Sequence, residues 1–164
     1  MKKVFFLLLF AASVSTVSYA QPSHRPIGTI SADLGVGAGV SCIPATLDVK
    51  YTLFRPSPSV TLNAGASTAL GLGLSRENGV NQFFVGPLFG INVDFMDQFE
   101  FFTKFVIGYK SMSYGSILSH RFGYGTYAGI SYFPTEKIGI GGYLGYGEVS
   151  FVGVQLTFIL VQSK

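Results

Sequence analysis

The chain has 164 residues, of which 48% are hydrophobic and only 12% are charged. A soluble domain carries about 25% charged residues, so the composition argues against an ordinary soluble protein. With eleven basic and eight acidic residues there is no basic stripe for nucleic acid. One cysteine, Cys42, and two histidines exclude a disulfide scaffold and supply too few ligands for a zinc site. We therefore expect no metal and no cofactor.

Residues 1–20 have the features of an export signal. Two lysines precede an apolar run, Val4–Ala12, that is too short to span a bilayer. Small residues stand one and three positions before Gln21, which predicts cleavage at that point. Residues 21–164 are then expected to form a single domain. They contain no segment of roughly 18 uninterrupted apolar residues, the length expected of a membrane helix.

Eight runs of residues alternate apolar side chains with glycine, polar or charged ones, which is the two-residue period of a β-strand. In chain order they are Gly28–Val40, Thr46–Phe54, Val60–Leu74, Phe83–Phe95, Phe99–Lys110, Phe122–Tyr132, Ile138–Tyr146 and Phe151–Leu160. Pro87 lies inside the fourth run, and because proline cannot donate to a ladder we expect a β-bulge there. The even number of runs predicts that both termini lie at the same end.

The apolar face of these runs, represented by Leu72, Ile91 and Ile140, is expected to point outward to lipid. The rival is a soluble lipocalin-type barrel, whose polar face would meet water. Here that face is mostly glycine, and eight strands enclose too little space for nearly all of the bulky apolar residues. The sequence therefore predicts an all-β fold, an eight-stranded antiparallel up-and-down transmembrane β-barrel with a packed polar interior.

The inward face is predicted to carry a cluster of charged side chains. Its four acids and three bases are Asp33, Asp48, Lys50, Asp94, Glu100, Lys104 and Lys110. Charges away from water must pair or be hydrated, so we expect them to cross-link strands through the lumen. Asp94 and Glu100 face each other across a turn and need a cation such as Lys104. Isolated charges on solvated rims are the alternative for Lys110 and Arg121.

The connection lengths and the aromatic residues predict an orientation. With a periplasmic N-terminus, the inner turns are short and the outer connections longer. The inner turns are Arg55–Ser59, Met96–Gln98 and Pro134–Lys137, and the outer connections are Ser41–Ala45, Arg76–Asn81, Ser111–Arg121 and Gly147–Ser150. Aromatic residues should gather at both membrane interfaces, although strands favour them anyway. Those at the inner ends are Phe95, Phe99, Tyr132 and Phe158, and those at the outer ends are Phe83, Tyr109, Phe122, Tyr124 and Tyr146.

The chain resembles the small eight-stranded outer-membrane β-barrels of the porin-fold and opacity type. The resemblance rests on the hairpin Tyr127–Gly142 and on the final strand, in which Gly153, Leu156 and Phe158 match the spacing of the family's C-terminal insertion signal. Phe151 departs from the polar residue usual there, and six residues follow Phe158. The resemblance implies insertion by the barrel assembly machinery into the bacterial outer membrane. It also implies contact with outer-membrane lipids and periplasmic termini.

Members of such a family serve as anchors, adhesins, small pores and occasionally lipid-modifying enzymes. We expect a monomer with a structural or surface-interaction role, a lumen filled by side chains, and an unidentified surface partner at residues 111–121. The inward glycines favour a narrow pore for small solutes as the alternative. An enzyme is a third reading, with Ser119, His120 and Glu148 as its residues. The His-x-Ser element of outer-membrane lipid A deacylases is missing, and adjacent strand residues point apart, so no catalysis is expected.

Overall fold

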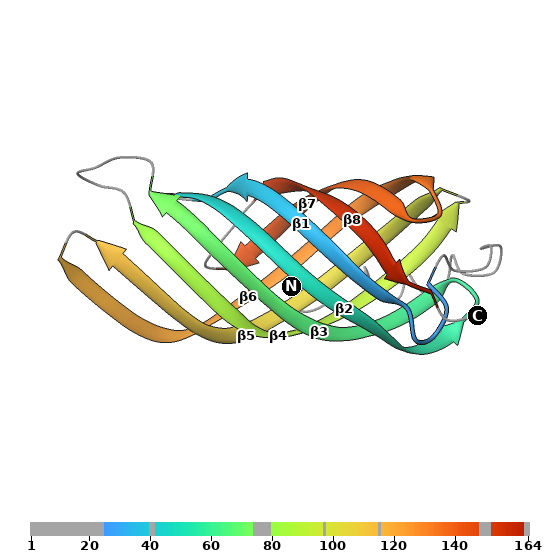
Figure 1. The fold of residues 1–164 in the computed structure, drawn as a ribbon, viewed down its shortest axis with the longest axis horizontal. Coiled ribbons are helices and arrows are strands. Elements are labelled where there is room, and N and C mark those ends of the chain that lie inside the picture. Colours follow the sequence, from blue (N-terminus) through green and yellow to red (C-terminus); the bar gives the residue numbers. More distant parts are fainter. Residues whose placement is uncertain are drawn as a thin grey trace, which may run out of the picture.

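A computed structural model describes residues 25–39, 42–73, 80–96, 98–114, 116–147 and 152–162. The predicted export signal lies outside the described residues. The strands are β1 (Ile30–Ala38), β2 (Cys42–Ser57), β3 (Val60–Gly73), β4 (Asn81–Met96), β5 (Phe99–Tyr114), β6 (Ile117–Thr135), β7 (Ile138–Gly147) and β8 (Val152–Val161). Figure 1 shows them as long, tilted, twisted ribbons around one axis. The described part of the chain has no helix long and apolar enough to cross a membrane.

The eight strands close into one antiparallel barrel. Each strand pairs with its neighbours in the sequence, and β8 returns to pair with β1. The predicted up-and-down topology is therefore confirmed. β1 begins where β8 ends, with Ile30 opposite Val161, and we call this the terminal end. The opposite end, the hairpin end, carries the β5–β6 hairpin, which runs on past the other strands (Figure 1).

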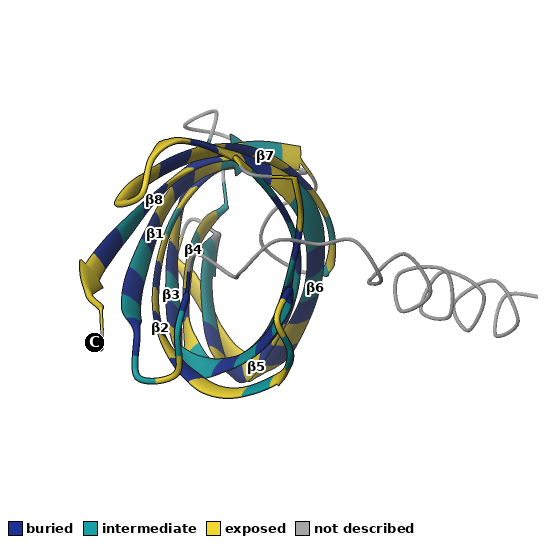
Figure 2. Cartoon of the chain, turned by 90° about the vertical axis from the view of Figure 1, so that its right-hand side faces the viewer, coloured by how far each residue is buried: buried dark blue, intermediate teal, exposed yellow. Residues whose placement is uncertain are grey.

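Side chains alternate between the two faces of every strand, as their sequence parity predicts. Leu72 and Ile140 point outward and are 69% and 53% exposed, while the glycine, polar and charged parity points inward. Figure 2 shows the alternation as bands of buried and exposed residues along each strand. The lipocalin-type arrangement is excluded, because its apolar residues would lie inside. An exposed apolar belt around the whole ring is the surface that lipid requires.

Three of the four aromatic residues expected at the terminal end form a continuous cluster on the outer surface. The ring of Phe99 lies 5.9 Å from that of Phe95 and 5.2 Å from that of Tyr132, measured between centroids. These three residues come from β4, β5 and β6. Their arrangement matches the aromatic girdle expected where strands leave the hydrocarbon region.

Several strands are longer than the sequence pattern predicts. The expected connection Ser41–Ala45 is mostly strand, since β2 begins at Cys42, and the expected turn Arg55–Ser59 is strand as far as Ser57. The expected loop Ser111–Arg121 is likewise wrong, because β5 continues to Tyr114 and β6 begins at Ile117. Backbone pairing does not need an alternating apolar face once a strand has left the membrane, so the pattern stops before the strand does.

The bulge expected at Pro87 is absent. β3 and β4 stay in register through Ala66 and Pro87, and the β4–β5 register is unchanged on both sides of the proline. Around the proline, the pairs at Gly86 and Pro87 drop out of the β4–β5 ladder. The backbones approach closely there: a Cβ added to Gly86 would overlap the carbonyl oxygen of Ile107, and one on Gly108 would overlap that of Val85. The two facing glycines thus let β4 and β5 approach closely beside the proline, and no extra residue is inserted in either strand.

The projecting hairpin has one open edge. Residues 117–124 of β6 pair with β5 from Ile107 to Tyr114 along their whole length. Pairing with β7 begins only at Gly125, so in the described part of the chain the other edge of residues 117–124 has no strand partner. This edge presents backbone donors and acceptors outside the barrel.

Candidate functional site in the barrel lumen

The middle of the lumen is crossed by an ion pair between opposite walls. Lys104 on β5 donates from Nζ to Asp48 Oδ2 on β2, and both side chains are more than 90% buried. The second oxygen of Asp48 accepts a 2.6 Å hydrogen bond from Ser67 on β3. Gln155 on β8 places its Oε1 3.4 Å from the same ammonium group. Four strands are thereby linked through one cation.

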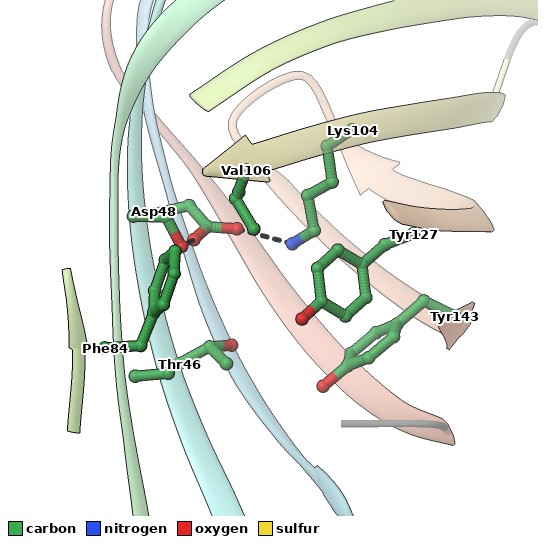
Figure 3. Close-up of a pocket in the computed structure, with 9 residues that line it drawn as sticks. Thr46, Asp48, Phe84, Lys104, Val106, Tyr127 and Tyr143 are labelled. Atoms are coloured by element: carbon green, nitrogen blue, oxygen red, sulfur yellow. Dashed lines mark hydrogen bonds and ion pairs between the residues drawn. The ribbon is translucent and has the colours of Figure 1, made fainter. Parts of the chain in front are cut away.

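The rings of Tyr127 and Tyr143 lie beside this ammonium group, as Figure 3 shows. Lys104 Nζ lies 5.5 Å from the ring centroids of both Tyr127 and Tyr143 and 5.9 Å from that of Phe102. The two tyrosine rings pack edge to face at 5.9 Å. The space left between these side chains and Asp48 is about 10 Å³, enough for no more than a single water molecule. We call Asp48, Lys104, Tyr127 and Tyr143 the central plug.

A second ion pair lies nearer the terminal end. Lys50 Nζ is 2.5 Å from Asp33 Oδ2, and Thr157 donates a 2.9 Å hydrogen bond to Asp33 Oδ1. These residues come from β2, β1 and β8 and lie on the inward face of each. These contacts therefore link β1 to β2 and to β8, at the place where the first and last strands close the ring.

Amide and hydroxyl side chains link the next three strands. Thr52 on β2 donates a 3.0 Å hydrogen bond to Asn63 on β3, which in turn donates one of 2.7 Å to Asn92 on β4. All three side chains are buried. Hydrogen bonds of this kind satisfy polar groups that the barrel wall removes from water.

Glu100 is paired with Arg25, not with Lys104 as the sequence pattern suggests. Arg25 Nη2 donates a 2.8 Å hydrogen bond to Glu100 Oε1, and both side chains are 1% exposed. Asp94 lies directly opposite Glu100 in the β4–β5 register, as predicted. Lys104 is four positions further along β5, about 13 Å away at strand spacing, and is held by Asp48. The sequence analysis missed Arg25 because this residue precedes the first alternating run.

All seven residues of the predicted charge cluster are buried inside the barrel. They are Asp33, Asp48, Lys50, Asp94, Glu100, Lys104 and Lys110. The rim position considered for Lys110 is wrong, since its side chain is 2% exposed. Arg121, its register partner on β6, is exposed on the projecting hairpin.

Two residues of the catalytic alternative, Ser119 and His120, do not face each other. Ser119 and His120 follow each other in β6, so their side chains point to opposite faces. His120 Nδ1 is 2.5 Å from the hydroxyl oxygen of Tyr109, and the two rings stack at 5.6 Å. Glu148 lies outside the described residues. Among the described residues, no three His, Cys, Asp or Glu side chains are placed to hold a metal ion.

The residues of the predicted insertion signal occupy both faces of β8. Leu156 points outward and is 41% exposed. Phe158 has the same parity and pairs with Ala32 of β1. Gly153 points inward, where an added Cβ would overlap the ring of Tyr143. The small residue at position 153 therefore makes room for the central plug, and recognition by the assembly machinery stays a prediction.

The outward apolar belt, the closed ring and the filled lumen define the class of protein. The chain is an eight-stranded transmembrane β-barrel whose interior is packed with side chains.

Solved structures with the same fold agree with this class. A de novo designed transmembrane β-barrel matches with a TM-score of 0.54 and 15% identity, covering 82% of this chain and 97% of the designed one. The N-terminal β-barrel domain of OprF from Pseudomonas aeruginosa matches with a TM-score of 0.55 and 10% identity, covering 80% of this chain and 97% of that domain. No protein-family model matches the chain, and no curated protein matches its sequence. At these identities the likeness concerns the fold alone.

Proposed function

We propose that the protein is a monomeric barrel of the bacterial outer membrane with a structural or surface-interaction role. Its lumen is closed, its termini lie in the periplasm, and its projecting hairpin contacts a partner outside the cell. The expected export signal and the membrane-type fold support the compartment. The long hairpin at the end opposite the termini supports the orientation, because barrels of this type carry their longer connections on the outer side.

The observation that carries the proposal is the central plug. An ion pair crosses the lumen between β2 and β5, two tyrosine rings pack against its ammonium group, and about 10 Å³ remains. Passage of a hydrated ion would require breaking a buried ion pair, which costs about 3–5 kcal/mol when one partner loses the other. A resting lumen of this kind favours a plugged barrel over the narrow-pore alternative.

The projecting hairpin supports the surface role. The open edge of residues 117–124 offers a row of backbone groups to which an extended segment of a partner can add as a strand. Its side chains include the exposed apolar residues Ile117 and Leu118, which are 66% and 61% exposed. Exposed apolar residues along the open edge of a strand favour association with another chain. Residues 111–121 are accordingly the proposed contact region.

Conductance separates the plugged barrel from the pore. Protein refolded into planar bilayers, and checked for heat-modifiable gel mobility, is expected to give no persistent current. A stable open current from such protein would assign the pore instead. Mass spectrometry of lipid A from cells with and without the protein is expected to give identical spectra, and a new modified species would favour the enzyme.

Site-specific photocrosslinking on intact cells tests the contact region. A photoreactive amino acid at Leu118, on the hairpin, is compared with one at Ile138, an exposed residue at the terminal end. The proposal expects one discrete crosslinked product from position 118 and none of that mass from position 138. The same products from both positions, or none from position 118, would contradict the proposed role of the hairpin.

A further inference from the structure

The terminal mouth of the lumen holds a guanidinium group supplied by the chain itself. Arg25 is only 1% exposed although it precedes the first strand. Its Nη2 donates to Glu100 Oε1 at 2.8 Å, and its Nη1 donates to Ser31 Oγ at 3.2 Å. Its guanidinium carbon lies 5.8 Å from the ring centroid of Phe133. Three strands, β1, β5 and β6, thus contribute to one binding site.

A tight turn directs Arg25 back into the barrel. The amide of Thr29 donates to the carbonyl oxygen of Pro26 at 3.1 Å, and Gly28 has a φ of 88°. These are the features of a type II turn, which needs a positive φ at its third residue and so favours glycine there. The turn is tied to β2 by the 2.9 Å bonds from Gly28 to Thr52 and from Thr52 to Thr29. Arg25 lies just beyond these ties, on the side of the predicted N-terminus.

The groups around the site select a guanidinium group. Asp94 lies beside Glu100 in the register, so two carboxylates face the same end of the lumen. Glu100 Oε2 is buried and has no hydrogen-bond partner in the described part of the chain. A planar fork donating to a carboxylate while stacking on an aromatic ring is the recognition geometry of arginine. A lysine ammonium group or a simple inorganic cation has the charge but lacks the planar fork.

We propose that the terminal mouth of the lumen is a guanidinium-binding site and that Arg25 is its removable occupant, a latch that closes this mouth. Cleavage before Gln21 would make Arg25 the fifth residue of the mature chain, next to the turn that leads into β1. Withdrawal of the latch exposes Asp94 and Glu100 to the aqueous phase and makes the mouth attractive to cations. Passage stays blocked deeper in the lumen by the central plug. The inference does not depend on the role proposed for the hairpin.

The latch is tested by the accessibility of a thiol placed beneath it. Ser31→Cys is made in a Cys42→Ser background, which removes the natural thiol. A cationic and an anionic methanethiosulfonate reagent then label the folded barrel in vesicles. With Arg25 present, we expect slow labelling by both. With Arg25→Ala, we expect labelling by the cationic reagent to become at least about tenfold faster than labelling by the anionic one, the lower end of what a focused field produces.

Ligand rescue identifies the chemistry of the site. Methylguanidinium at millimolar concentration is expected to restore protection of Cys at position 31 in the Arg25→Ala protein, whereas tetramethylammonium at the same concentration is not. Arg55→Ala is the matched control, because Arg55 lies at the same end and donates to the carbonyl of Pro58 on the turn. That variant should leave labelling unchanged.

Three results would overturn the proposal. The first is labelling of Cys at position 31 that is as fast with Arg25 in place as in the Arg25→Ala protein. The second is equal protection by methylguanidinium and tetramethylammonium. The third is an effect of Arg55→Ala on the labelling rate as large as that of Arg25→Ala. If Arg25→Ala does not assemble, Arg25→Lys keeps the charge and loses the fork. It should give an intermediate labelling rate that methylguanidinium lowers, and a rate equal to that of the parent would contradict a guanidinium site.

Discussion

Replacing Lys104 by Met tests whether the central plug is dry. The substitution keeps most of the side-chain volume and its contact with Tyr127 and Tyr143, but it leaves the Asp48 carboxylate buried without its cation. Breaking a buried ion pair from one side costs about 3–5 kcal/mol, and two cation–π contacts at 5.5 Å add about 1 kcal/mol or more. We expect Lys104→Met to lower the free energy of unfolding by about 4–6 kcal/mol. Urea titration in lipid vesicles, followed by heat-modifiable gel mobility, measures it.

A double variant separates charge from packing. Asp48→Asn with Lys104→Met removes both charges and keeps an oxygen that accepts from Ser67. It should therefore recover at least about 2 kcal/mol of the loss, because apolar or neutral replacements of a whole buried pair are often tolerated. An ion pair that is exposed to water contributes less than about 1 kcal/mol to stability. Lys104→Met alone would then lower the free energy of unfolding by no more than this amount. That result would mean a hydrated lumen and would refute the plug.

Two further predictions concern the barrel wall. Gly86→Ala should lower the free energy of unfolding by about 1–3 kcal/mol, the usual penalty of overpacking, because its Cβ would meet the backbone of β5. Gly142→Ala should be nearly neutral, because its Cβ would have its nearest contact at 3.9 Å. The same urea titration measures both. Phe89→Arg in the middle of the outward face should cost about 2–4 kcal/mol in lipid, and Ile117→Arg on the projecting hairpin should cost almost nothing. Equal costs within either pair would contradict the assigned surroundings.

The sequence was sufficient to predict the strands and their faces. Residues such as Leu72 and Ile140 share a parity with the other bulky side chains of their runs, and a two-residue period assigns a whole strand once one face is known. The same period could not locate the ends of β5 and β6. Ser111 to Arg121 lack an apolar face, since a strand surrounded by water on both sides does not need one.

The pairing of the inward charges could not be predicted from the pattern. Asp48 and Lys104 lie on β2 and β5, which are not neighbours, and they meet only because the ring closes with a particular stagger between its strands. Arg25 lies before the first alternating run, and its position in the lumen depends on a turn at Gly28. The guanidinium group of Arg25 therefore binds the carboxylate of Glu100, which the sequence pattern pairs with Lys104.

The absence of tryptophan from the chain permits a direct test of which face meets lipid. Phe89→Trp places an indole on the outward face, and Phe84→Trp places one inside beside the central plug, where Phe84 is 2% exposed. In vesicles with brominated acyl chains, the fluorescence of the first is expected to be strongly quenched. The fluorescence of the indole at position 84 should be quenched neither by the brominated acyl chains nor by acrylamide in the aqueous phase. Quenching of the inner indole by the lipid, or its free access to acrylamide, would contradict a sealed barrel with its apolar face in the bilayer.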